Sequence, residues 1–252
     1  MKPIYTLFIL VLFFNCKPEK TEKVLTADAI VNTSIDISGG NKVPNSKISF
    51  DFRGQKYLAT RNNGAFVLGR VTTTETNDSI FDLLSNDSFE RFINDELITV
   101  ADSMIPRYSA SVNSVHYFSV LPYGLNDKAV HKELLGEESI KEKLYYKIKV
   151  TFSKEGGGED YDDEFIYWIN KDNHKVDYVA YSYAEDDGVG IRYREAYNER
   201  IVNGVRFVDY NNYKPDASEK SLLNLGQLFE DGKLKLLSKI ELEAITVDLI
   251  NN

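Results

Sequence analysis

A single cysteine carries the most specific chemical signal in the sequence. Cys16 is the only cysteine among the 252 residues, so the chain cannot form an internal disulfide. It follows Lys2, an apolar run over residues 4–14, and Asn15. The run is about as long as the apolar part of a signal peptide and too short to cross a bilayer as a helix. This arrangement is typical of a bacterial lipoprotein signal, in which the peptidase cuts before the cysteine and acyl chains are then attached.

Acylation at Cys16 predicts a protein held in the cell envelope. Several acyl chains hold a protein at a membrane far more firmly than one chain does. Lys17 stands where an aspartate would favour retention in the inner membrane, so we expect the outer membrane. We expect residues 1–15 to be the signal peptide, residues 16–23 a lipidated tether and residues 24–252 a single domain. The alternative is an ordinary secretory signal followed by an incidental cysteine.

Carboxylates crowd two expected loops in the C-terminal half of the chain. One loop covers residues 155–163 around three glycines, and the other covers residues 185–189. In a simple meander both loops lie at the same end of the sheet. Hard cations such as Ca²⁺ bind several carboxylate oxygens, so a cation site is one interpretation. Solvated hairpin tips and acid–base catalysis at an acidic rim are the alternatives. The candidate ligands are Asp160, Asp162, Asp163, Asp186 and Asp187.

Aromatic residues and arginines could form a second kind of site. The chain has 16 tyrosines and 14 phenylalanines, many of them in its C-terminal half. They favour either ordinary core packing or an aromatic concavity for an apolar ligand. Arg192 and Arg194 share one face of an expected strand, and an arginine inside such a concavity could hold a carboxylate or phosphate. The candidate ligand-binding residues are Val115, His116, Tyr193, Arg194, Tyr197 and Tyr210.

Composition and missing motifs exclude several classes of function. The formal net charge is −9, and it becomes more negative when Lys2 is removed with the signal. Nucleic-acid binding needs a basic face, so we expect no nucleic-acid partner. The three histidines are widely separated, and the sequence has no HExxH, CxxC, GxSxG or phosphate-loop motif. We therefore expect a non-enzymatic, ligand-binding lipoprotein without a cofactor, Ca²⁺ aside. A hydrolase or lyase at the acidic rim and a structural or partner-binding module are the alternatives.

The elements that must position these residues form an α+β pattern. Apolar residues at helical spacing predict a helix over 25–37, closed by Gly39-Gly40, and a second helix over 103–121. Alternating residues and turn signals such as Asn62-Asn63-Gly64 and Asn203-Gly204 predict antiparallel strands. We expect one large curved sheet, a half-barrel, with an N-terminal helix and a helical lid. The expected strands are 46–53, 56–61, 65–74, 89–93, 97–100, 130–135, 143–153, 164–170, 175–184, 190–198, 205–213 and 233–249.

Several blocks of this sequence resemble a family of uncharacterised Gram-negative envelope lipoproteins. The blocks are GGGEDYDDEFIYWIN (156–170), VDYVAYSY (176–183), GIRYREAYN (190–198), VNGVRFVDYNNYK (202–214), LTADAIVNTSIDISGG (25–40) and SVNSVHYFSVLPYGL (111–125). The resemblance covers nearly the whole chain after the tether and implies no established activity. The expected layout also resembles the LolA-like half-barrel of lipoprotein carriers, which implies a lid over a concave sheet.

The cysteine generates a direct prediction. Cys16→Ala removes the only side chain that can form the thioether, so the variant should incorporate no labelled palmitate and should leave the membrane fraction or stay uncleaved. Lys17→Ala keeps the thiol and serves as the matched control, which should remain labelled. Palmitate incorporation into Cys16→Ala would contradict the predicted anchor.

Overall fold

Two antiparallel sheets of seven strands each form the body of the protein, as seen in a computed structural model that describes residues 25–157, 161–185 and 188–250. The first sheet contains, from edge to edge, β14 (Glu243–Leu249), β1 (Asn45–Phe52), β2 (Gln55–Asn62), β3 (Ala65–Thr73), β4 (Ser79–Ser85), β5 (Phe89–Ile93) and β6 (Glu96–Ile98). The second contains β13 (Lys235–Ile240), β12 (Val205–Lys214), β11 (Gly188–Val202), β10 (Val176–Glu185), β9 (Phe165–Asn170), β8 (Lys143–Phe152) and β7 (Val130–Ile140).

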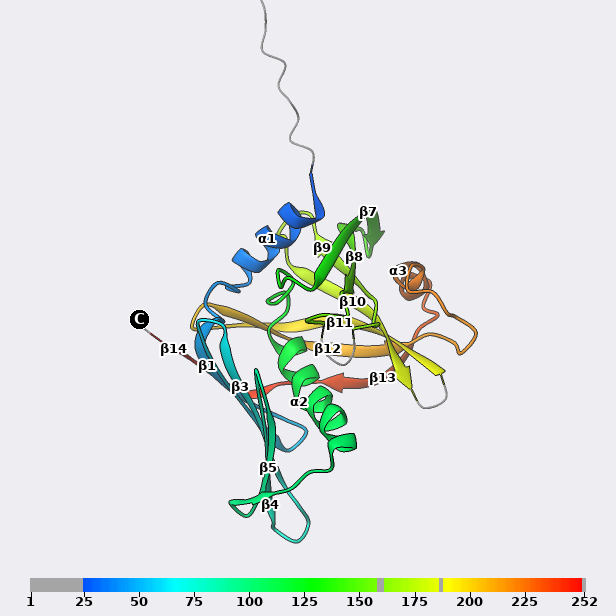
Figure 1. Cartoon of the computed structure of the whole chain (residues 1–252). Helices are drawn as coiled ribbons and strands as arrows, with labels where there is room; N and C mark the ends of the chain where they lie inside the picture. Colours follow the sequence, from blue (N-terminus) through cyan, green and yellow to red (C-terminus); the bar gives the residue numbers. More distant parts are fainter. Residues whose placement is uncertain (1–24, 158–160, 186–187, 251–252) are drawn as a thin grey trace, which may run out of the picture.

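The two sheets together form the unclosed curved sheet expected from the sequence. The expected final strand over 233–249 is in fact two strands, because the chain changes sheets between Ile240 and Glu243. β13 pairs with β12, whereas β14 pairs with β1. This change divides the predicted single sheet into two, and Figure 1 shows β13 and β14 following one another along the junction. The fold class, an α+β half-barrel, is confirmed.

The predicted hairpin turns set the register in which neighbouring strands pair. Asn62 pairs with Ala65, so Asn63 and Gly64 form a two-residue turn. Their φ angles are +50° and +89°, the left-handed region that such a turn requires and that Asn and Gly accept most readily. Val202 likewise pairs with Val205 across Asn203-Gly204. β4, which the sequence analysis does not predict, completes the meander between β3 and β5.

A bulge in β11 determines which residue of β12 lies opposite Arg194. A two-residue turn at Asn203-Gly204 alone would set Arg194 opposite Tyr213. The ladder shifts between Tyr197 and Arg200, because one extra residue enters β11 there. Arg194 consequently pairs with Asn212, and Tyr213 pairs with Tyr193.

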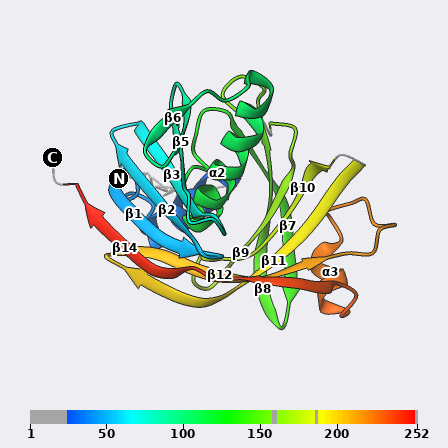
Figure 2. The ribbon, with the colours of Figure 1, turned by 90° about the horizontal axis from the view of Figure 1, so that it is seen from below.

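Three helices cover the sheets from different sides. α1 (Ala27–Ile37) begins at Thr26, whose Oγ1 accepts a hydrogen bond of 3.2 Å from the Ala29 amide. α2 (Ile105–Ser119) follows the short 3₁₀ helix η1 (Asp102–Met104) and lies inside the curve of the sheets (Figure 2). The predicted N-terminal helix and helical lid are thus confirmed. α3 (Leu225–Glu230), not predicted, lies on the outer side of the second sheet (Figure 2). None of the helices in the described residues is long and apolar enough to cross a membrane.

The buried side chains divide into three clusters that follow these helices. One cluster packs α1 and the loop after α2 against the inner face of the second sheet, through residues such as Ile30 and Leu125. Another packs α2 through Val112 against the first sheet. The third lies under α3 around Trp168. A helix therefore covers much of the inner face of each sheet, as an apolar sheet face requires.

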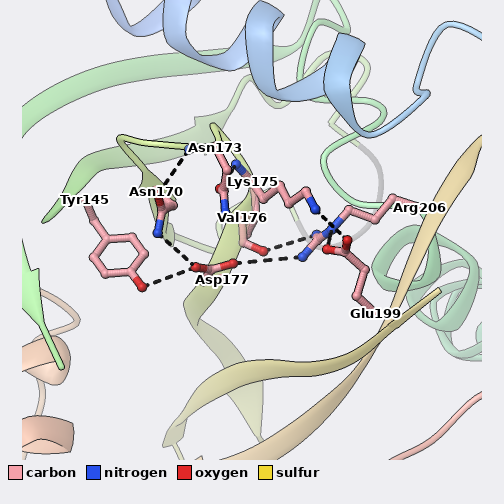
Figure 3. Close-up of polar contacts among 8 residues, drawn as sticks. All are labelled: Tyr145, Asn170, Asn173, Lys175, Val176, Asp177, Glu199 and Arg206. Carbon is pink, nitrogen blue, oxygen red and sulfur yellow. Dashed lines mark hydrogen bonds and ion pairs between the residues drawn. The ribbon is translucent and has the colours of Figure 1, made fainter. Parts of the chain in front are cut away.

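A buried polar network links four inner strands of the second sheet, β12, β11, β10 and β8, next to the β11 bulge. Arg206 is buried, and its Nε donates to Glu199 Oε2 at 2.7 Å while its Nη1 donates to the Val176 carbonyl at 3.2 Å. Figure 3 shows this guanidinium also facing Asp177, at 4.0 Å. Asp177 in turn accepts a bond of 3.2 Å from the Tyr145 hydroxyl. Nearby carboxylates of the protein therefore balance the charge of Arg206.

A second network holds α2 on the first sheet. The buried Asp82 accepts from Arg70 Nη2 at 2.7 Å and from Arg91 Nε at 2.6 Å. Arg70 also donates to Ser111 Oγ of α2 at 2.7 Å, and the Arg91 guanidinium lies 3.7 Å from the centre of the Tyr108 ring of α2. One buried carboxylate therefore orients the two arginines that reach the lid helix from β3 and β5 of the first sheet.

This network predicts a stability effect. Asp82→Asn leaves two partly buried arginines without their counter-charge, so the free energy of unfolding should fall by about 3 kcal/mol, measured by denaturant titration. Asp87→Asn, at an exposed turn, is the control and should change it by less than about 0.5 kcal/mol. Equal midpoints for the two variants would contradict the role of Asp82.

Candidate functional site

A small cavity lies between α2 and the inner face of the sheets. Its volume is about 60 Å³. The side chains around it come from α2, from β11 and β12, and from the junction of β13 with β14. They are Phe52, Ser114, Val115, Phe118, Ser119, Arg194, Val208, Tyr210, Ile240 and Leu242. Most of the lining is apolar, and Arg194 is its only charged member.

Arg194 reaches the cavity because alternate residues of β11 point to its two faces. Its Nη2 donates to the Tyr181 hydroxyl at 2.7 Å, and its guanidinium lies 3.6 Å from the centre of the Phe118 ring. In the described part of the chain Arg194 makes no ion pair, and its buried Nε has no hydrogen-bond partner. The site thus combines an apolar lining with one cation that aromatic rings hold in place.

Three of the six predicted ligand-binding residues come together here: Val115, Arg194 and Tyr210. Tyr193 does not reach the cavity, because it lies on the opposite face of β11, buried under α3 against Phe229. Tyr197 shares that face and donates to Glu241 at 2.8 Å.

His116 occupies a different position on α2, facing the first sheet. It is buried, and its Nε2 lies 3.1 Å from the Gly69 carbonyl oxygen, which fixes this nitrogen as the donor. Its ring contacts those of Phe50 and Tyr57, with centroids 5.7 and 5.5 Å away. Burial, with a smaller contribution from the charge of Arg61, lowers the pKa of His116 to about 3, although the hydrogen bond to Gly69 opposes this shift. His116 is therefore a neutral hydrogen-bond donor that fastens α2 to β3.

Sequence reasoning misses other lining residues for identifiable reasons. Phe118 lies three positions after Val115 and so shares its face of α2, a signal that helical spacing contains. Ile240 and Leu242 could not be assigned, because they sit where the chain changes sheets and no turn residue marks that point.

The predicted cation ligands are only partly visible. Asp160, Asp186 and Asp187 lie outside the described residues, as do Cys16 and the tether. Asp162 is exposed, Asp163 is half-buried, and neighbouring Glu164 pairs with Lys149 at 2.8 Å. Among the residues that the structure describes, no group of three His, Cys, Asp or Glu side chains is arranged to hold a metal ion.

Comparison with known proteins identifies the family. Residues 2–242 match a family of unknown function, DUF6503, and the chain belongs to that family. No curated protein matches the chain significantly.

Several solved structures are similar to the chain at low sequence identity. A LolA superfamily protein from Nitrosomonas europaea is 13% identical, with a TM-score of 0.48 over 90% of this chain and 94% of that one. A DUF1329 family protein from Desulfovibrio piger is 11% identical, with a TM-score of 0.45 over 90% and 95%. A putative outer membrane lipoprotein-sorting protein domain from Vibrio parahaemolyticus is 6% identical, with a TM-score of 0.38 over 72% and 86%.

The buried histidine generates a pH prediction. Folded His116 takes up a proton only near pH 3, whereas an unfolded histidine does so near pH 6.5. Between these values the unfolded state binds more protons, so the free energy of unfolding falls as the pH falls, by up to about 1.4 kcal/mol per pH unit. His116→Gln keeps a donor for Gly69 but does not titrate, so its stability should fall less steeply from pH 6.5 to 5.

Denaturant titrations at several pH values measure these slopes. His131→Gln is the matched control, since His131 is exposed, and it should keep the parent's slope. Carboxylates contribute alike to all three proteins. A slope for His116→Gln that equals the parent's would contradict the assignment of a neutral, buried His116.

Proposed function

We propose that this member of the DUF6503 family binds an apolar or amphipathic ligand in the cavity beneath α2, while acyl chains on Cys16 hold it at a membrane of the cell envelope, the outer membrane. The observation that carries the proposal is a concave, apolar lining that contains one arginine with no acidic partner among the described residues. Ligand sites are typically apolar with a few placed polar groups, which is the composition found here.

The arginine suggests the chemistry of the ligand. A guanidinium recognises carboxylates and phosphates through two parallel hydrogen bonds, and it remains charged at physiological pH. The Phe118 ring on one side of Arg194 holds the guanidinium in the cavity without neutralising it. An acyl chain with an acidic head would match both halves of this lining.

The size of the cavity indicates how such a ligand enters. A volume of about 60 Å³ corresponds to only about five water molecules. An acyl chain therefore requires the C-terminal half of α2 to move away from the second sheet. Aromatic side chains make most of the contacts between that half and the second sheet, with Phe118 packed against Phe165 and Tyr181. The Tyr117 and Tyr167 hydroxyls add a hydrogen bond of 2.8 Å. Each buried CH₂ of the ligand contributes about 0.8 kcal/mol, which offsets the loss of these contacts.

The proposal predicts how a larger lid residue acts. Val115→Trp should fill the cavity and weaken the binding of a fluorescent long-chain fatty acid at least about tenfold, that is by about 1.4 kcal/mol. The same variant should lose less stability than the roughly 1–3 kcal/mol that overpacking costs in a filled core. Val67→Trp, at an exposed position of β3, is the control and should bind as the parent does.

A second variant tests the head group. Arg194→Gln should weaken binding of the fatty acid more than binding of the corresponding alcohol, because only the acid is charged. If the parent binds neither compound, or if Val115→Trp destabilises the fold by 1–3 kcal/mol or so while binding is unchanged, the cavity is ordinary core and the proposal is wrong.

A further inference from the structure

A second, larger cavity lies on the other side of α2. Its volume is about 160 Å³, and it opens between the β2–β3 hairpin, α2 and the loop that follows α2. Val115 and Phe118 face the first cavity, whereas Asn113, Tyr117 and Val120 of the same region face the second. The side chains that matter here are Arg61, Phe66, Leu68, Asn113, Tyr123 and Asp127.

Arg61 enters this cavity from an apolar face. The residues of β2 that point inward are Tyr57, Ala59 and Arg61, at every second position, and the first two belong to the core beneath α2. Arg61 is only 8% exposed. A charged side chain at the third inward position is unexpected, because desolvating a guanidinium costs several kcal/mol unless a partner compensates.

The fold supplies Arg61 with no such partner. Among the described residues its guanidinium makes no ion pair, and its buried Nη1 has no hydrogen-bond acceptor. The Tyr123 ring, 5.8 Å from the guanidinium carbon, is its nearest aromatic neighbour. Burial lowers the pKa of Arg61, although an arginine remains charged at any physiological pH.

Four other arginines of the protein pair with acidic side chains and so contrast with Arg61. Arg70 and Arg91 share the carboxylate of Asp82, and Arg200 donates to Asp209 at 2.8 Å. The equally buried Arg206 pairs with Glu199 (Figure 3). An acid faces each of these four arginines. Arg61 lacks that acid and faces a cavity instead.

We propose that the second cavity binds an oxyanion, a carboxylate or a phosphate, with Arg61 as its anchor. The guanidinium offers paired N–H donors to two oxygens of one anion, which would satisfy Nη1 and neutralise the buried charge. Asn113 and the Tyr123 hydroxyl also line this cavity and are further donors. The site is separate from the cavity that contains Arg194, so the inference stands whether or not that cavity binds a ligand.

Asp127 gives the site a second testable property. It lines the same cavity but makes no ion pair with Arg61 in the described structure. Its negative charge repels an incoming anion. Asp127→Asn should therefore tighten anion binding, an effect opposite to that of removing Arg61.

The experiment is thermal unfolding of the whole protein in millimolar inorganic phosphate, against sodium chloride of equal ionic strength. A ligand that binds only the folded state raises the Tm by mass action. The parent's Tm should rise, Arg61→Gln should lose the site-specific part of the rise, and Asp127→Asn should show it at lower phosphate concentration. Arg107→Gln removes an exposed arginine of α2 and should behave as the parent does. The rise that remains in Arg61→Gln measures the general stabilisation that phosphate gives any protein.

Further arms distinguish the source of the anion. Acetate tests a free carboxylate. Dihexanoyl phosphatidic acid presents a phosphate on a lipid, and dihexanoyl phosphatidylcholine is its zwitterionic control. A larger response to phosphatidic acid than to inorganic phosphate identifies a lipid head group, and equal responses identify a free oxyanion. Either result supports the site if Arg61→Gln abolishes it.

Two results would overturn the inference. One is a parent Tm that responds to none of these anions beyond the chloride control. The other is an equal response from the parent and Arg61→Gln. If Arg61→Gln does not fold, Arg61→Lys and Asp127→Asn test the inference instead. The Tm of Arg61→Lys must rise less with phosphate than the parent's, because lysine lacks the planar guanidinium fork. The Tm of Asp127→Asn must rise more than the parent's.

Discussion

An open, curved sheet cannot bury its own concave face, and the structure of this protein depends on that constraint. Two seven-stranded sheets share one concave side, and α2 is the element that lies inside it (Figure 2). The N-terminal half of α2 is fixed to the first sheet by polar contacts from Arg70 and Arg91, and His116 adds a bond to β3. Toward the second sheet the same helix offers mainly aromatic contacts. Polar contacts thus hold α2 on the first sheet, mainly aromatic contacts hold it on the second, and a cavity lies on each side of the helix.

The charged side chains on the concave side indicate what kind of ligand these cavities would bind. Burying a cation is costly, and the fold compensates Arg206 and Arg200 with nearby acids. In the described part of the chain no acid compensates Arg194 or Arg61, which face the two cavities on either side of α2. An interior that accepts positive charge without an internal counter-charge is suited to ligands that bring a negative one.

The sequence predicts much of this fold and less of the sites. Turn residues such as Asn63-Gly64 require positive φ angles and so reveal the hairpins, and helical spacing reveals α2. The β11 bulge escapes prediction because its extra residue leaves the local alternation unchanged on either side, and the register of Arg194 moves by one residue as a result. Arg61 could have been found, since it continues the inward alternation of Tyr57 and Ala59. Its missing partner depends on distant segments and appears only in three dimensions.

The central claim is that the protein holds a ligand beneath α2, and native mass spectrometry of gently purified protein tests it most directly. Comparison of native and denatured masses separates a bound ligand from the covalent acyl chains, because only the ligand is lost on unfolding. The account predicts an additional mass of lipid size in the native parent and its loss in Val115→Trp. A native parent with no mass beyond its covalent form, or a bound mass that Val115→Trp retains in full, would contradict it.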